Sequence, residues 1–114
     1  MHPSAVPTVD ANDVPSDAVL LDVREPEEWT AGHVPGALHV PMMRLPHQLQ
    51  HDPGPLTEDA AIVVICKVGS RSAQVTAWLR QQGYDAANLA GGMYSWVAAG
   101  RPIESSDDSP ARII

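Results

Sequence analysis

The apolar residues of the chain gather in short runs, separated by polar segments rich in glycine and proline. Two runs, AVLLDV at 18–23 and AIVVIC at 61–66, are almost entirely apolar. A run of this kind is typical of a strand that is buried on both faces of a parallel sheet. Weaker patterns predict three short strands at 8–9, 38–40 and 88–89.

The segments between the predicted strands have the apolar spacing of helices. Val75, Trp78 and Leu79 form one stripe along residues 70–83, which predicts an amphipathic helix with Gly83 as its C-cap. Further helices are predicted at 26–31, at 42–51 with Pro46 as an interruption, and at 91–100, with a loose helical turn at 11–14. Strands that alternate with helices indicate an α/β domain.

The length of 114 residues and the 44% of hydrophobic residues fit one compact domain. We predict an α/β fold with a central, mostly parallel, five-stranded sheet flanked by helices on both faces. Residues 1–17 form an N-terminal segment with the short edge strand, 18–102 the core, and 103–114 a polar tail. We interpret this tail as a frayed terminus, and the alternative is that Ile113 and Ile114 dock a partner.

Charge and composition exclude several classes of function. The net charge of -7 repels phosphate backbones, so we expect no nucleic-acid partner. No apolar run approaches the roughly 18 residues of a membrane helix, so no membrane association is expected. The N-terminus MHPSAVPTVD lacks the basic and apolar regions of a secretory signal. A single cysteine fits a reducing compartment, so we expect the chain to be cytoplasmic.

That single cysteine, Cys66, ends the apolar run at 61–66. A free cysteine often only fills space in a core, and this is the simplest interpretation of Cys66 taken alone. However, a short loop with Gly69 and a predicted helix follow it, and such a junction directs N–H groups toward one point. Lys67 and Arg71 add positive charge to this loop. The loop is therefore predicted to bind anions and to make Cys66 a reactive thiol.

Three segments of the chain resemble the rhodanese family of sulfurtransferases. CKVGSR at 66–71, followed by Ser72, resembles the family's six-residue active-site loop, Cys-x-x-x-x-Arg. LLDVREPEEWTAGHVPGALHVP at 20–41 resembles the upstream signature, and LAGGMYSWVAAGRP at 89–102 resembles the closing one. The segments follow the expected order and cover one rhodanese domain, without room for the second, inactive domain of longer members.

The resemblance implies covalent sulfur transfer that requires no metal and no cofactor. Cys66 would be the nucleophile that takes a sulfane sulfur from a small anionic donor such as thiosulfate, forming a persulfide. The acceptor would be cyanide, a thiol or a protein. Lys67 and Arg71 would hold the donor, and loop N–H groups would stabilise the persulfide. The substrate-binding set is therefore Lys67, Val68, Gly69, Ser70, Arg71 and Ser72.

Other polar residues of these segments have competing roles. Arg71 either binds the donor or braces the loop, and both roles stay open. Ser70 or Ser72 is expected to cap the following helix. Three residues are expected to support the strand end and the pocket rim rather than to react, namely Asp22, Arg24 and Glu28.

The histidines are weaker candidates for chemistry. His33 could serve as a general base, but the resemblance places it in a turn, and we predict a structural hydrogen bond. His47 and His51 are four residues apart, as metal ligands on a helix are. Pro46 and the lack of a third ligand argue against a metal site, so we expect both to be surface residues.

Two other functions remain as alternatives. Cysteine-dependent phosphatases and arsenate reductases of the same fold resemble Cys-x5-Arg, but Arg71 follows Cys66 by five positions rather than six. The mercaptopyruvate-using branch resembles a loop that begins with Cys-Gly and ends with Val-Thr, from which Lys67 and Arg71 depart. A sulfur carrier that turns over little thiosulfate is the non-enzymatic alternative. The sequence leaves the physiological donor and acceptor, the pathway and the oligomeric state open.

Overall fold

The computed structural model describes residues 6–114 and contains one five-stranded sheet in which every pair of neighbours is parallel. The strand order is β1-β5-β4-β2-β3, so the two apolar strands β4 and β2 are adjacent near the centre. The strands are β1 (Thr8–Val9), β2 (Val19–Asp22), β3 (Leu38–His39), β4 (Ala61–Ile65) and β5 (Asp85–Leu89). The predicted five-stranded α/β domain is therefore confirmed.

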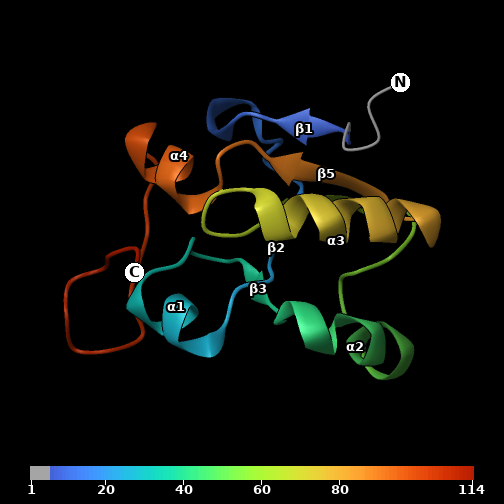
Figure 1. Ribbon diagram of the computed structural model, residues 1–114, viewed down its shortest axis with the longest axis horizontal. Coiled ribbons are helices and arrows are strands. Elements are labelled where there is room, and N and C mark those ends of the chain that lie inside the picture. The colour runs from blue at the N-terminus through green and yellow to red at the C-terminus, as the bar shows by residue number, and fades with distance from the viewer. Residues whose placement is uncertain (1–5) are drawn as a thin grey trace.

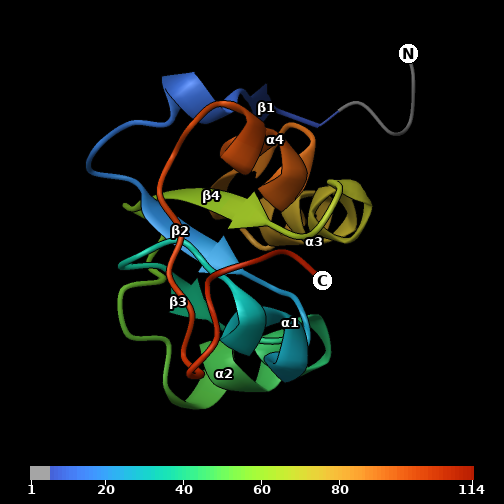
Figure 2. The ribbon, with the colours of Figure 1, turned by 90° about the vertical axis from the view of Figure 1, so that its left-hand side faces the viewer.

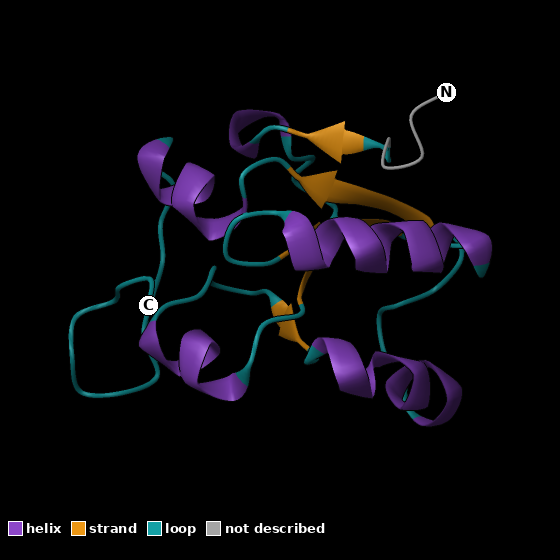
Figure 3. Cartoon of the chain, viewed as in Figure 1, coloured by secondary structure: helices purple, strands orange, loops and turns teal. Residues whose placement is uncertain are grey.

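Helices cover both faces of this sheet (Figures 1 and 3). The four α-helices are α1 (Pro26–Ala31), α2 (Leu45–His51), α3 (Ser70–Gln81) and α4 (Gly92–Ala98). Two short 3-10 helices, η1 (Ala11–Asp13) and η2 (Met42–Arg44), complete the fold. Leu45 of α2 and Leu79 of α3 pack against one face of the sheet, whereas Met93 and Trp96 of α4 pack against the other.

The side chains of β4 alternate between these two cores. Ile62 and Val64 face the core under α2 and α3, and Val63 and Ile65 face the core under α4. All four are at most 3% exposed, which explains why the strand is apolar at every position. The parallel pairing of β4 with β2 and β5 sets its register and places Ile65, its last residue, opposite Asp22.

Two elements differ from the prediction for physical reasons. Pro46 does not interrupt a helix, because α2 begins at Leu45 and the proline falls in its first turn, where no N–H bond is lost. Strand β5 is longer than predicted and includes Asp85, Ala86 and Ala87. Alanine and aspartate have low strand propensity, so pairing with β4 and β1 determines this strand rather than its composition.

The C-terminal segment lies beside α1 and is hydrogen-bonded to it (Figure 2). The expectation that residues 103–114 are a frayed terminus is therefore corrected. The N–H of Arg112 donates to the carbonyl of Ala31, and the Arg112 guanidinium pairs with Asp107 at 3.1 Å. Ile113 packs against the core under α4, and Ile114 is 46% exposed. Within residues 6–114, no helix combines the length and the apolar character that crossing a membrane requires.

Candidate active site

Cys66 directly follows β4 and begins the loop that leads into α3. The neighbouring strand β2 ends at the same edge, because Asp22 lies opposite Ile65 in the parallel register. In open α/β sheets, ligands bind beyond the carboxyl ends of the strands, which is where this loop lies. The sequence-predicted residues of the two strand ends are therefore brought together.

The sulfur of Cys66 is surrounded by hydrogen-bond donors of its own loop. The N–H of Gly69 donates to Sγ at 3.0 Å, and the hydroxyl oxygen of Ser72 lies 3.2 Å from Sγ. Gly69 has φ of +105°, a left-handed conformation that lets the chain curl back toward the sulfur. The whole cysteine residue is buried, so the sulfur forms the floor of the loop.

These contacts determine the acidity of the thiol. Burial raises the pKa of Cys66, but hydrogen bonds from the Ser72 hydroxyl and from the N–H groups of Ser72, Gly69 and Val68 lower it. The hydrogen bonds prevail, so the pKa of the thiol lies below its ordinary value. The loop therefore favours the thiolate, the form of cysteine that acts as a nucleophile.

The expectation that Ser70 or Ser72 caps α3 is wrong. Gly69 occupies the N-cap position, and no side chain of this cap makes a hydrogen bond to the helix. The hydroxyl of Ser72 instead lies 2.5 Å from Oδ1 of Asn88, in addition to its contact with the sulfur. Ser72 is fully buried, which places its hydroxyl inside the site rather than at the helix surface.

The N-terminus of α4 holds the carbonyl groups of the loop. The N–H of Met93 donates to the carbonyl of Cys66 at 2.9 Å, and the N–H of Tyr94 donates to that of Lys67 at 3.3 Å. A Cβ atom on Gly92 would lie 2.4 Å from the Cys66 carbonyl oxygen, so this position requires glycine. Gly92 also has φ of +61°. The Gly-Gly pair of the closing segment thus permits a close approach to the active-site loop.

Asn88 is a site residue that the sequence analysis missed. It lies in β5 and is 8% exposed. Its Nδ2 donates to the carbonyl of Gly69 at 3.2 Å, while its Oδ1 faces Ser72. A buried asparagine within a strand of small residues was the available signal, because buried polar side chains require partners.

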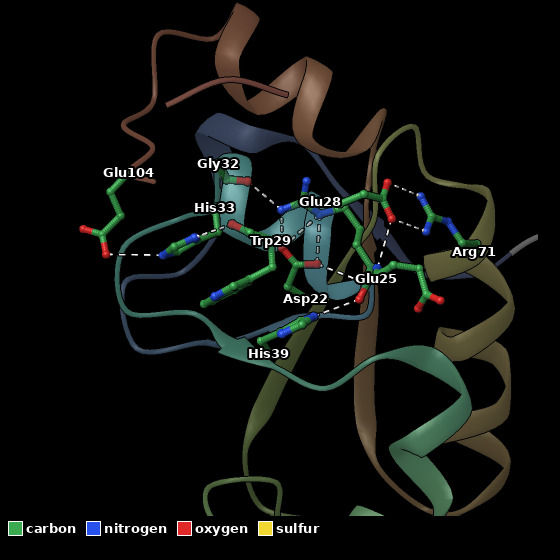
Figure 4. A network of polar contacts seen from close by, with 10 residues as sticks. Asp22, Glu25, Glu28, Trp29, Gly32, His33, His39, Arg71 and Glu104 are labelled. Carbon is green, nitrogen blue, oxygen red and sulfur yellow. Dashed lines mark hydrogen bonds and ion pairs between the residues drawn. The ribbon is translucent and has the colours of Figure 1, made fainter. Parts of the chain in front are cut away.

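Arg71 points from α3 to Glu28 of α1 (Figure 4). Its two terminal nitrogens donate to the two carboxylate oxygens of Glu28 at 2.8 and 2.9 Å. This pairing lowers the pKa of Glu28 to about 2, with Arg71 as the main cause, and it raises the pKa of Arg71. Of the two roles left open for Arg71, the geometry favours bracing.

Glu28 is itself fixed within α1. Its carboxylate accepts the N–H of Glu25 at 3.0 Å, and the two residues form a reciprocal capping box at the start of this helix. The active-site loop is therefore anchored to the first turn of α1 through one carboxylate.

Asp22 and Arg24 form a fully buried pair at the end of β2. Arg24 donates to both carboxylate oxygens of Asp22 at 2.8 to 3.1 Å and to the carbonyl of Gly32 at 2.7 Å. With its charge neutralised and its side chain enclosed, this pair links the strand end to the end of α1, as a supporting role requires.

His33 of the upstream segment makes structural contacts. His33 Nδ1 lies 2.7 Å from the carbonyl oxygen of Trp29, and its Nε2 lies 3.4 Å from Glu104. Its ring stacks on Trp29 at 3.8 Å, and His39 stacks on Trp29 at 4.7 Å (Figure 4). The two other predicted candidates, His47 and His51, have rings 4.3 Å apart. Among residues 6–114, no three potential ligands gather at a metal-sized site.

The outer side of the loop presents Lys67 and Val68. The ammonium of Lys67 lies 5.7 Å from the ring centre of Tyr94, which is itself half exposed. Val68 is 53% exposed, an unusual position for a large apolar side chain. Lys67 forms no ion pair with any residue in the described part of the chain.

Similarity to known proteins agrees with this geometry. The Rhodanese-like domain family matches residues 9–99. A sulfurtransferase of Allochromatium vinosum is 40% identical over 88 residues, which cover 76% of this chain and 78% of that protein. The human thiosulfate:glutathione sulfurtransferase is 38% identical over 91 residues, covering 70% of this chain and 79% of that protein.

A solved structure supports the same assignment. The rhodanese-related protein of Thermoplasma volcanium superposes with a TM-score of 0.78 at 30% identity, covering 86% of this chain and 97% of that one. The family match spans most of the chain, and each of the two relatives aligns with it over more than three quarters of its own length. The chain therefore belongs to the rhodanese-like family of sulfurtransferases.

Proposed function

We propose that the protein is a thiosulfate sulfurtransferase in which Cys66 carries the sulfur as a persulfide. The observation that carries this proposal is the pair of hydrogen-bond donors at the Cys66 sulfur, namely the Gly69 N–H and the Ser72 hydroxyl. They favour a thiolate at rest and can stabilise an anionic sulfur chain after transfer. The human relative named thiosulfate:glutathione sulfurtransferase supports this choice of donor.

The first step is an attack of the Cys66 thiolate on the sulfane sulfur of thiosulfate. A new S–S bond forms on Cys66, and the bond to the sulfonate sulfur breaks, so sulfite leaves with that electron pair. The total charge of three negative units is conserved: one on the persulfide and two on sulfite. In the second step the acceptor, a thiolate or cyanide, attacks the outer sulfur and regenerates the Cys66 thiolate.

The charged side chains of the loop have different roles in this proposal. Arg71 is neutralised by Glu28, so it positions the loop instead of binding the donor. Lys67 makes no ion pair with a described residue and is the cation that binds the thiosulfate dianion. Because Cys66 is buried, a donor must displace the atoms that cover its sulfur before it can react.

One observation favours a second candidate, a carrier that receives sulfur from a protein persulfide. A single lysine is a weak site for a dianion in a protein of net charge -7, whereas exposed Val68 can contact a protein surface. A putative sulfur carrier protein of Bacillus subtilis is 33% identical over 79 residues, which cover 40% of that protein. Either activity requires a free Cys66 thiol, which is consistent with a reducing compartment such as the cytoplasm.

The intact mass of the protein after incubation with thiosulfate tests the proposal. We expect a gain of about 32 mass units, one sulfur atom, which cyanide removes. The variant Cys66→Ser is expected to keep the fold and to gain no mass. A thiosulfate adduct that persists in Cys66→Ser would exclude Cys66 as the acceptor of sulfur.

The same experiment separates the two candidates. If thiosulfate gives no adduct but a protein persulfide loads Cys66, the carrier function replaces the enzymatic one. If neither donor loads the protein, both candidates are rejected, and the hydrolysis of an aryl phosphate then tests the phosphatase alternative.

A further inference from the structure

The hydroxyl group of Ser72 lies between two acceptors that compete for it. Its oxygen is 3.2 Å from Sγ of Cys66 and 2.5 Å from Oδ1 of Asn88. A serine hydroxyl has one hydrogen, and an amide oxygen has none. Ser72 can therefore donate to the sulfur or to Asn88, but not to both at full strength.

The orientation of the Asn88 amide follows from its other contact. Its Nδ2 donates to the carbonyl of Gly69 at 3.2 Å. The opposite orientation would place Oδ1 against that carbonyl oxygen, so two acceptors would face each other without a hydrogen. The Gly69 carbonyl thus keeps Oδ1 directed at Ser72, and β5 holds the asparagine in place through its pairing with β4.

The protonation state of Cys66 decides whether its sulfur, the Ser72 hydroxyl and Asn88 Oδ1 can all form hydrogen bonds at once. When Cys66 is a thiol, its S–H donates to the Ser72 oxygen, and Ser72 donates to Asn88, which gives an unbroken chain. When Cys66 is a thiolate, the Ser72 hydrogen turns to the sulfur and leaves two oxygens facing each other at 2.5 Å. If the hydrogen stays with Asn88, the thiolate loses a donor instead.

We propose that Asn88 is a positioning residue that restrains the reactivity of Cys66 by competing with its sulfur for the single hydrogen of Ser72. Asn88 therefore favours the thiol over the thiolate. In the persulfide, the negative charge moves to the outer sulfur, and the Ser72 hydrogen returns to Asn88. The pair thus responds to the state of the sulfur, and its role in turnover rests on the proposed function of Cys66.

The charged groups near the thiol do not change with Asn88. Arg71 of α3 forms an ion pair with Glu28 of α1. The negative charge of the Cys66 thiolate contributes to the raised pKa of Arg71. Lys67 of the loop lies against Tyr94 of α4. At the end of β2, Asp22 and Arg24 form a buried ion pair. A substitution at Asn88 therefore leaves these charges in place.

The rate of alkylation by iodoacetamide as a function of pH tests the proposal, because this reagent reports the thiolate without any sulfur transfer. In Asn88→Leu, which has the same branching at Cγ and no acceptor, we expect the midpoint to fall by about one pH unit. This corresponds to a tenfold change in the thiolate equilibrium, or ~1.4 kcal/mol. In Asn88→Asp, the acceptor remains and gains a negative charge, so the midpoint should rise.

A second background separates the competition from the loss of the Gly69 contact. In Ser72→Ala, no hydroxyl is present, so adding Asn88→Leu should leave the midpoint unchanged. The loss of the bond to the Gly69 carbonyl is the same in both backgrounds. An equal shift with and without Ser72, or a rise in the midpoint of Asn88→Leu, would overturn the proposal.

Folding and function are controlled separately. Thermal unfolding identifies a variant that fails to fold, and Asn88→Ala then replaces Asn88→Leu with the same expected direction. Persulfide formation measured by mass tests the proposed sulfur transfer and does not depend on the direction of the alkylation shift. A wild-type protein that alkylates as expected but never accepts sulfur would contradict the proposed function and leave the role of Asn88 intact.

Discussion

The guanidinium of Arg71 is held by Glu28 through two hydrogen bonds of 2.8 and 2.9 Å, between residues 43 positions apart in the chain. Bidentate pairs of this kind fix both orientation and distance. The contact joins the start of α3 to the start of α1, so the active-site loop lies between two anchored helices. Because Glu28 already pairs with this guanidinium, we propose that Arg71 braces the loop.

We predict that Glu28→Gln impairs sulfur loading and stability together. The amide retains the shape of the side chain but cannot accept both guanidinium hydrogens as a carboxylate does. The free energy of unfolding should fall by about 1 kcal/mol, and the rate of persulfide formation should fall several-fold. Urea unfolding and intact mass measured over time check the two effects.

Glu27→Gln is the matched control for this change. Glu27 is the neighbouring acidic residue on α1, is exposed, and forms no ion pair with another described residue. It carries the same charge, so both variants alter the net charge equally, and Glu27→Gln should stay within about 0.5 kcal/mol of the wild type. Equal effects of the two variants would show that charge, not the brace, is responsible.

The same ion pair predicts how stability depends on pH. The pKa of Glu28 is lowered from 4.5 to about 2 in the folded protein. A carboxylate with a lowered pKa stabilises the fold above its unfolded pKa, and this contribution is lost as the pH falls toward the folded pKa. The difference in unfolding free energy between wild type and Glu28→Gln should therefore be constant above about pH 5.5 and shrink between pH 4.5 and 2. A difference that is unchanged at pH 2.5 would assign the stabilisation to something other than ionised Glu28.

The sequence was sufficient to predict the sheet and the place of the thiol. Two strands, one apolar at every position and the other apolar up to its final Asp22, define the centre of a covered parallel sheet. A cysteine directly after one of them lies at the functional edge. The short strand β3 also followed from the glycine and proline residues around it, whereas β5 was predicted only at its last two residues. Helices on both faces then follow, because both faces of the central strands are apolar.

The partners of the polar side chains could not be predicted in the same way. Ser72 has the position and type of a capping residue, and only the left-handed Gly69 and the proximity of Asn88 redirect its hydroxyl into the site. Arg71 could reach either a ligand or a carboxylate, and the choice depends on the packing of α1, which is distant in sequence. Contacts between distant segments follow from packing, which local patterns do not encode.

Lys67 provides a test of donor binding that does not involve the thiol. Without its ammonium, the site should bind a dianion less well, so Lys67→Ala should raise the KM for thiosulfate by about three- to tenfold with a smaller change in kcat. Lys67→Arg retains the charge and should restore most of the affinity. Steady-state kinetics with cyanide as acceptor measure both constants, and an unchanged KM in Lys67→Ala would exclude contact between Lys67 and the donor.

The contact between Gly92 and the loop carbonyls predicts a large effect from a single methyl group. In Gly92→Ala, the new Cβ would lie 2.4 Å from the Cys66 carbonyl oxygen and 2.6 Å from that of Lys67, so the loop must move away from α4. We expect a loss of about 3 kcal/mol of stability and a slower alkylation of Cys66, because its hydrogen bonds depend on the loop. Gly100→Ala is the control: Gly100 has a similar φ of +76°, but its Cβ would meet nothing within 4 Å. That variant should lose only about 1 kcal/mol from backbone conformation and keep the reactivity of the thiol. If the two variants prove equally reactive and equally stable, the close approach of α4 does not hold the active-site loop.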